Sequence, residues 1–156
     1  MDKKQLLKQH SIYMATRDAM QSYMDAYLAS DNFKRTTRVK RPSEDVKIYE
    51  DLIKNTSLMP IARYVVDRIN DTIFETGQTR NIQFVNSSGS LVGTPDWAKL
   101  FMIDTDFSNN DITATMANAS VMASVFGHCW LVVDKPTMDS RPYVNVISTL
   151  SVWNWE

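Results

Sequence analysis

The order in which apolar periodicities follow one another limits the fold of this chain more than any other feature. Helical spacing runs through most of the chain as far as residue 126, and the clearest strand patterns come after it. The first pattern predicts one long helix over residues 3–28, with a stripe that recurs every seven residues at Leu6, Tyr13, Met20 and Tyr27. Asp31 and Asn32 break this helix. The helices are therefore expected in the N-terminal part of the sequence and the sheet in its C-terminal part.

Prolines and glycines mark the ends of the later helices. A second helix is predicted over residues 42–55, starting at Pro42, and a third starts at Pro60 and ends at Gly77. Residues 95–103 form a short helix, and a longer one covers 110–126 and ends at Gly127. The third helix carries apolar residues at every fourth position, namely Ile61, Val65, Ile69 and Ile73.

Short apolar or alternating runs predict strands at residues 81–85, 128–133, 143–147 and 151–155. Residues 87–90 form a turn after the first strand, and the connection 136–142 joins the middle two strands into a β-hairpin. The expected fold class is α+β, with N-terminal helices followed by a small, mostly antiparallel sheet.

Length and composition are those of one ordinary folded domain. The chain has 156 residues, of which 44% are hydrophobic and 22% charged. Residues 1–55 are predicted to be an N-terminal helical segment with a basic connection, and residues 56–156 an α+β region. Because the chain stops within the aromatic pattern of Trp153 and Trp155, we expect it to be a piece of a longer protein.

Charge divides the chain into two poles although the formal net charge is only -1. Residues 1–80 contain 14 Lys/Arg and 11 Asp/Glu, whereas residues 81–156 contain 3 and 7. Such poles favour contacts between different faces of two copies. The single cysteine, Cys129, excludes an intrachain disulfide, and no signal peptide or membrane-spanning run is visible, so we expect a cytoplasmic site of synthesis and no membrane partner.

The residues offer little catalytic chemistry. No glycine-rich phosphate loop is present among the four glycines, so nucleotide hydrolysis is not expected. His128 and Cys129 are adjacent, but no second cysteine completes a zinc site, and neighbouring strand residues point to opposite faces. We predict no catalytic residue, no cofactor and no metal ligand, and we expect Cys129 to serve in packing.

Two charged clusters keep alternatives open. Asp104, Asp106 and Ser108 begin like a calcium loop, but position six is Asn109 and position twelve is Thr115, which favours helix capping over a metal-dependent nuclease. The run at residues 34–41 has five basic residues in eight. It could contact phosphates in a nucleic-acid-binding accessory protein, although it contains no aromatic residue for base stacking.

Three ordered motifs carry a resemblance to a known family. Residues 59–69 resemble the helix with which many portal proteins of tailed bacteriophages begin their conserved wing. Residues 119–136 resemble the portal element of a small-residue helix, a glycine and an apolar strand that ends in Val-Asp-x-Pro. Residues 141–147 and 152–155 are similar to the family's Arg-Pro-Tyr strand and its aromatic continuation. The resemblance covers about residues 55–156, and residues 1–50 resemble nothing that we can name.

The resemblance implies a structural protein of the virion. Portal subunits form a ring, typically dodecameric, at one capsid vertex, where DNA enters during packaging and leaves at ejection. The implied partners are further copies of the chain, the major capsid protein, a head-tail adaptor, the terminase motor and the DNA itself. The stem and clip of the family would lie beyond Glu156, so no residue here receives a channel or clip role.

A ring requires two different complementary faces on each subunit. The two charge poles supply such faces, and we expect the basic run of one copy to meet acidic residues of its neighbour. The predicted interface residues are Lys34, Arg35, Arg38, Lys40, Arg41, Asp104, Asp106 and Asp111.

Overall fold

The computed structural model describes residues 8–78, 80, 82–137 and 140–155. Its helices precede its longer strands, as the α+β prediction required. The helices are α2 (Ser11–Leu28), α3 (Asp31–Thr37), α4 (Val46–Asn55), α5 (Ile61–Phe74), α6 (Asp96–Ile103) and α7 (Ile112–Phe126), with a short 3-10 helix η1 (Thr149–Ser151). The strands are β1 (Phe84–Val85), β2 (Leu91–Val92), β3 (Trp130–Asp134) and β4 (Tyr143–Ile147).

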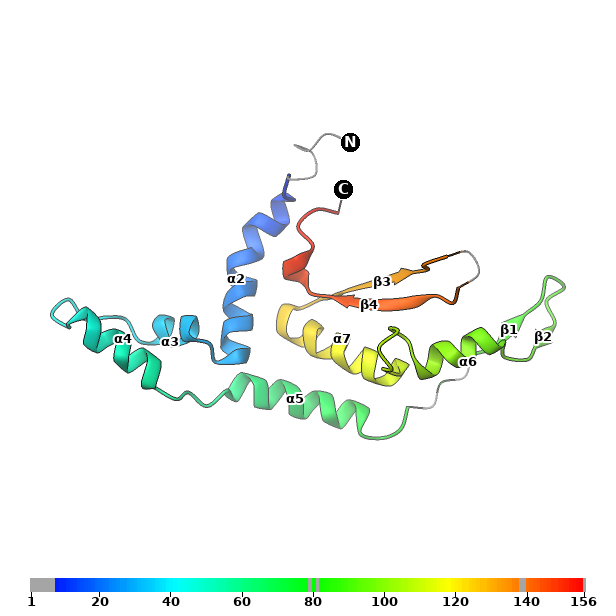
Figure 1. Ribbon diagram of the computed structural model, residues 1–156, viewed down its shortest axis with the longest axis horizontal. Coiled ribbons are helices and arrows are strands. Elements are labelled where there is room, and N and C mark those ends of the chain that lie inside the picture. The colour runs from blue at the N-terminus through cyan, green and yellow to red at the C-terminus, as the bar shows by residue number, and fades with distance from the viewer. Residues whose placement is uncertain (1–7, 79, 81, 138–139, 156) are drawn as a thin grey trace.

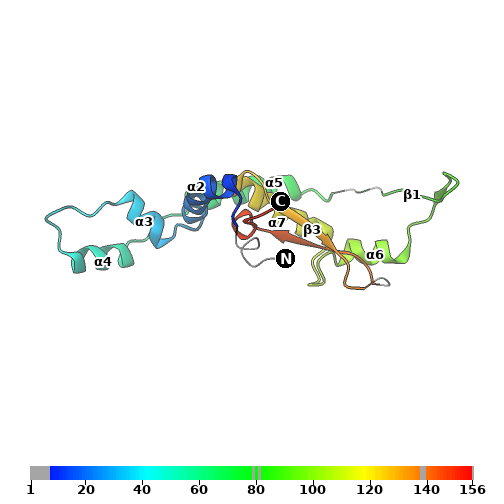
Figure 2. The same ribbon diagram turned by 90° about the horizontal axis from the view of Figure 1, so that it is seen from above.

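The molecule is long and thin. Figure 1 shows α3 and α4 at one end of the longest axis and α6 with the β1–β2 hairpin at the other. Between them lies a body formed by α2, α5, α7 and the β3–β4 hairpin, and the view from above shows how little depth the arrangement has (Figure 2). The strands form two separate two-stranded antiparallel sheets, β1–β2 and β3–β4, whereas the sequence predicted a single small sheet in the C-terminal part.

The core of the body is small. α5 packs against α7 and α2, and α7 also packs against α2 and β4. The apolar side chains buried in the body are Tyr13, Met20, Ala119, Phe126 and Val144. On α5 the buried residue is polar, Asn70, and its Oδ1 has no hydrogen-bond partner within the described chain.

The segments near the two chain ends are tied together. The amide of His10 donates to the carbonyl of Trp153 at 2.8 Å, and the Tyr13 hydroxyl donates to the carbonyl of Leu150 at 3.1 Å. The rings of His10 and Trp155 stack with centroids 4.2 Å apart. The first turn of α2 is thus fixed against residues 150–155, so these two segments, far apart in the sequence, lie side by side.

Several predicted boundaries need correction. The first helix begins at Ser11, because the His10 side chain accepts the amide of Ile12 and caps it, and residues 8–10 are not helical. The predicted positions 3–7 lie outside the described residues. The break comes at Ala29, which is left-handed with φ 50°, and Ser30 then caps α3, so Asp31 starts a helix.

Further corrections concern the strands and Gly77. Of the strand predicted at residues 81–85, position 81 lies outside the described residues and β1 covers Phe84–Val85. The strand predicted at residues 151–155 is absent, because residue 151 ends η1 and residues 152–155 pair with no other strand. α5 ends at Phe74, so Gly77 is not its cap. The predicted end at Gly127 is confirmed by its left-handed conformation, φ 83°. The strand predicted at residues 143–147 is also confirmed, and it pairs with β3 from Tyr143↔Asp134 to Ile147↔Trp130.

Candidate subunit interface

The predicted basic run lies in a projecting two-helix unit, residues 31–59, which we call the arm. α3 and α4 form it, and α3 packs against the end of α2 (Figure 1). Ile53 and Tyr49 are buried, with 2% and 7% exposure, and the Tyr49 hydroxyl donates to the carbonyl of Arg38 at 3.0 Å. The arm therefore has a small core of its own.

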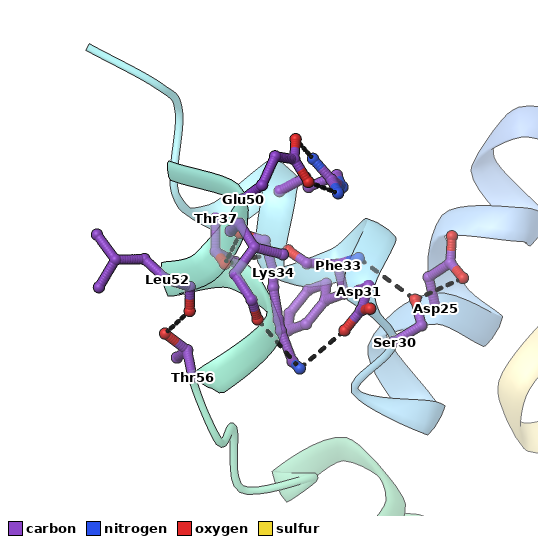
Figure 3. Close-up of polar contacts among 11 residues, drawn as sticks. Asp25, Ser30, Asp31, Phe33, Lys34, Thr37, Glu50, Leu52 and Thr56 are labelled. Atoms are coloured by element: carbon purple, nitrogen blue, oxygen red, sulfur yellow. Dashed lines mark hydrogen bonds and ion pairs between the residues drawn. The ribbon is translucent and has the colours of Figure 1, made fainter. Parts of the chain in front are cut away.

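Three of the five predicted cations form ion pairs inside this arm. Both terminal nitrogens of Arg35 donate to the carboxylate of Glu50, at 2.7 and 2.5 Å. Arg38 pairs with Glu44 at 2.7 Å, and Lys34 pairs with Asp31 at 2.8 Å. Figure 3 shows the Lys34 ammonium between Asp31 of α3 and a carbonyl of α4, and the forked contact that Glu50 of α4 accepts. These cations are engaged within the arm, and only part of the run is left for a partner.

Two of these ion pairs lower the pKa of the carboxylate that they engage. The hydrogen bonds from Arg35 hold the pKa of Glu50 below its usual range, and the hydrogen bond from Lys34 does the same for the pKa of Asp31. Both carboxylates are therefore charged at neutral pH, as the pairing requires.

Lys40 and Arg41 remain available at the tip of the arm. No ion pair of either side chain is found within the described residues, and the Lys40 ammonium contacts only the carbonyl of Arg41, at 3.4 Å. Val39 beside them is 78% exposed. Among the five predicted interface cations, these two are the ones that the geometry leaves for another molecule.

The predicted acidic residues lie in and beside the loop between α6 and α7, and each has a local role. Asp104 forms an ion pair with Arg141 at 2.5 Å, and Arg141 also donates to the Asp104 carbonyl. Asp106 accepts the Asn110 side chain at 2.7 Å, which lowers the pKa of Asp106 below its usual range. Asp111 caps α7 by accepting the amide of Ala114 at 2.7 Å. The capping predicted for this loop is therefore present.

The role of Arg141 could not be foreseen from spacing, because it lies 37 positions from its partner. Its guanidinium also lies 4.1 Å from the centroid of the Phe107 ring. It thereby links the α6–α7 loop to the start of β4. Because Arg141 pairs with Asp104, Asp106 and Asp111 are the carboxylates of this loop that form no ion pair within the described chain.

Within the described part of the chain, no three His, Cys, Asp or Glu side chains are placed to hold a metal ion, and no helix is long and apolar enough to cross a membrane. Cys129 is half-buried, and its thiol donates to the carbonyl of Ala119 at 3.4 Å. His128 lies edge-on to Trp130, with centroids 6.2 Å apart.

Exposed apolar side chains are the feature that sequence analysis missed. The apolar stripe of α5 faces outward, with 48% to 63% exposure at Ile61, Val65, Ile69 and Ile73. α4 exposes Ile48 and Leu52, and α6 exposes Trp97, Leu100 and Ile103. Helical spacing revealed the stripes, but spacing cannot say whether the surface that covers a stripe belongs to the same chain.

The chain matches no protein-family model, no curated protein and no solved structure. The functional argument therefore depends on the sequence motifs and on the geometry described above.

Proposed function

We propose that this chain is a structural subunit of a phage portal ring, the channel at a capsid vertex through which the genome is packaged and ejected. In this proposal it works through surfaces that fit further copies of itself, and it carries out no reaction. The observation that carries the proposal is the amount of surface that the single chain leaves bare.

The bare surface is larger than a monomer of this mass needs. The chain exposes 11435 Å² at a mass of 17.9 kDa. A folded monomeric protein of that mass exposes about 8,000 Å². In a ring each chain contributes one side to each of two contacts, so an excess of roughly 3,400 Å² per chain equals the total area of one contact. Permanent protein interfaces bury about 2,000 to 5,000 Å² in total over both partners. Copies that pack against one another would cover it.

A closed ring fits the unequal ends of the molecule. The arm and the α6 end differ in shape, in charge and in the helices that form them (Figure 1). Contacts between unlike faces repeat around an axis, and they close into a ring when the rotation allows it. A symmetric dimer would instead require one face that complements itself.

The resemblance to portal proteins is what points to a portal ring among the possible ring-forming proteins. Its motifs fall on α5, on α7 followed by β3, and on β4, which are the elements of the body. Further partners follow from this part of the proposal: the major capsid protein, a head-tail adaptor, the terminase motor and the DNA that passes through. The site of action would be the virion, after assembly in the host cytoplasm.

Electron microscopy of the purified chain tests the proposal. We expect negative-stain class averages of closed particles with cyclic symmetry. Monomers, or open filaments alone, would contradict the ring. The competing function, nucleic-acid binding by the basic run, predicts a salt-sensitive gel shift with duplex DNA. We expect no such shift, because three of the five cations are already paired inside the arm.

A further inference from the structure

The arm presents apolar side chains that its own chain does not cover. Ile48 and Leu52 lie one turn apart on α4, with 58% and 38% exposure, while Tyr49 and Ile53 fill the contact with α3. Figure 3 shows the Leu52 side chain pointing away from both helices of the arm. A two-helix projection with an outward apolar pair has the form of a docking element.

α6 presents a second exposed stripe at the other end of the molecule, in which Trp97 lies edge-on to Phe84 with ring centroids 5.7 Å apart. Trp97, Leu100 and Ile103 follow one another at three-residue spacing, with 46%, 57% and 69% exposure. The buried side of α6 is marked by Ala98, at 3% exposure. The stripe therefore faces solvent on the side opposite the one that packs.

The two ends also differ in charge. Residues 31–59 contain seven Lys/Arg and five Asp/Glu, whereas residues 80–111 contain two and four. At the tip of the arm Lys40 and Arg41 lack an ion pair within the described chain, and Asp106 and Asp111 lack one beside α6. Apolar stripes with unlike charges next to them are complementary surfaces.

These two surfaces cannot meet within one chain. The arm and α6 lie at opposite ends of the longest axis, with the body between them (Figures 1 and 2). The α6 stripe that the arm could cover must therefore belong to a second copy. Repetition of that contact joins unlike faces, as a ring requires.

We infer that the arm of one copy docks on α6 of the next copy. Ile48 and Leu52 contact the α6 stripe, and Lys40 and Arg41 lie near the loop that contains Asp106 and Asp111. This inference rests on the proposed function, because it names the contact by which copies associate.

Cysteine cross-linking between two variants tests the contact. One variant is Leu52→Cys and the other Leu100→Cys, each with Cys129→Ser and a tag of different mass. The two proteins are mixed, assembled and mildly oxidised, and products are separated without reductant. We expect a disulfide-linked heterodimer of the two tags. Lys54→Cys, which lies on the other flank of α4, replaces Leu52→Cys in the matched control, and we expect at least about tenfold less heterodimer.

The outcomes separate the inference from the proposal beneath it. Assembled particles without the Leu52–Leu100 heterodimer, or with equal yield from the Lys54→Cys control, would overturn the arm contact and leave the ring intact. Failure of the unsubstituted chain to assemble at any concentration would overturn both.

A second measurement needs no substitution. Hydrogen exchange of the unsubstituted chain is compared between assembled and diluted samples. We expect amides of α4 and of α6 to exchange at least about tenfold more slowly in the assembled sample. Equal exchange of α4 and α6 in the two samples, alongside slowing elsewhere, would assign the interface to other elements.

Discussion

At the scale of single residues, several charged side chains of this protein form ion pairs within the described chain. Arg35 and Glu50, 15 positions apart, form the forked ion pair that joins α3 to α4. Reversal of Arg35 or Arg38 would therefore disrupt the arm itself as well as any contact with a neighbour. Experiments on association must change other cations.

The Arg35–Glu50 pair should make the arm sensitive to acid. Because the folded-state pKa of Glu50 is depressed, the stabilisation is complete above the pKa of an unfolded glutamate, about 4.3, and disappears as pH falls through the lower folded-state pKa. Protection factors of the amides in α3 and α4, which compare the exchange rate with that of an unfolded chain at the same pH, should fall as the pH is lowered from about 6 to about 3. In Glu50→Gln these protection factors should be lower at neutral pH, and the acid response should shrink to the part that the Lys34–Asp31 pair contributes.

Glu75→Gln supplies the control for that series, because Glu75 follows α5 and belongs to none of the ion pairs of the described chain. An acid response in the Glu50→Gln arm equal to that of the unsubstituted chain would show that the pair does not hold the arm.

Asp111 offers a second test at this scale. Its carboxylate accepts the amide of Ala114 at the start of α7. Asp111→Ala should lower the free energy of unfolding by about 1 kcal/mol in urea titrations, because a helix amide loses its acceptor. Asp111→Asn should stay close to the unsubstituted protein, since asparagine caps a helix about equally well. Equal losses for both variants would contradict a capping role.

At the scale of elements, the junction of α7 and β3 depends on one left-handed residue. Gly127 ends α7 with φ 83°, and a Cβ placed there meets no atom within 4 Å. Gly127→Ala should therefore destabilise the protein by roughly 1 kcal/mol through backbone strain alone. Gly93→Ala is the matched control, because Gly93 has equally open surroundings and no positive φ. Thermal unfolding of both variants measures the difference, and equal melting temperatures would contradict the strain.

The elements were largely predictable from local chemistry. Proline, glycine and acidic caps placed α6 and α7 to within two residues, and β4 was placed without error. The end of α4 at Asn55 was also predicted, but α4 begins at Val46, four residues after the predicted start at Pro42. The strand expected at residues 151–155 failed because its apolar residues serve a different contact. Trp155 stacks on His10, and the Trp153 carbonyl accepts a hydrogen bond from the His10 amide. No local sequence pattern indicates these two contacts.

The candidate interface was predictable only in part. The run at residues 34–41 and the three aspartates were visible as charge, but their partners are distant in sequence. Arg35 forms its ion pair with Glu50, and Asp104 forms its ion pair with Arg141. Exposure of the stripes on α5 and α6 could not be foreseen, because amphipathic spacing is the same whether a helix packs on its own chain or on a neighbour.

At the scale of the whole molecule, charge and shape act together. A long chain with a basic arm and an acidic opposite end should associate more weakly when either charge is removed or screened. The double variant Lys40→Glu, Arg41→Glu should raise the concentration for half-assembly by about tenfold or more. Salt at about 0.5 M should weaken the association of the unsubstituted chain more than the association of this variant.

Mass photometry measures both effects. Lys8→Glu with Arg17→Glu makes the same change in net charge outside the arm, and it should leave half-assembly close to that of the unsubstituted chain. A similar weakening by both double variants would mean that net charge, and not the tip of the arm, governs association.

The central claim is that copies of this chain cover the surface it leaves bare. Size-exclusion chromatography with multi-angle light scattering tests this claim most directly, over a range of loaded concentrations. The account predicts a discrete species whose mass is a whole multiple of 17.9 kDa and that gains population as concentration rises. A mass of 17.9 kDa at every concentration would contradict it.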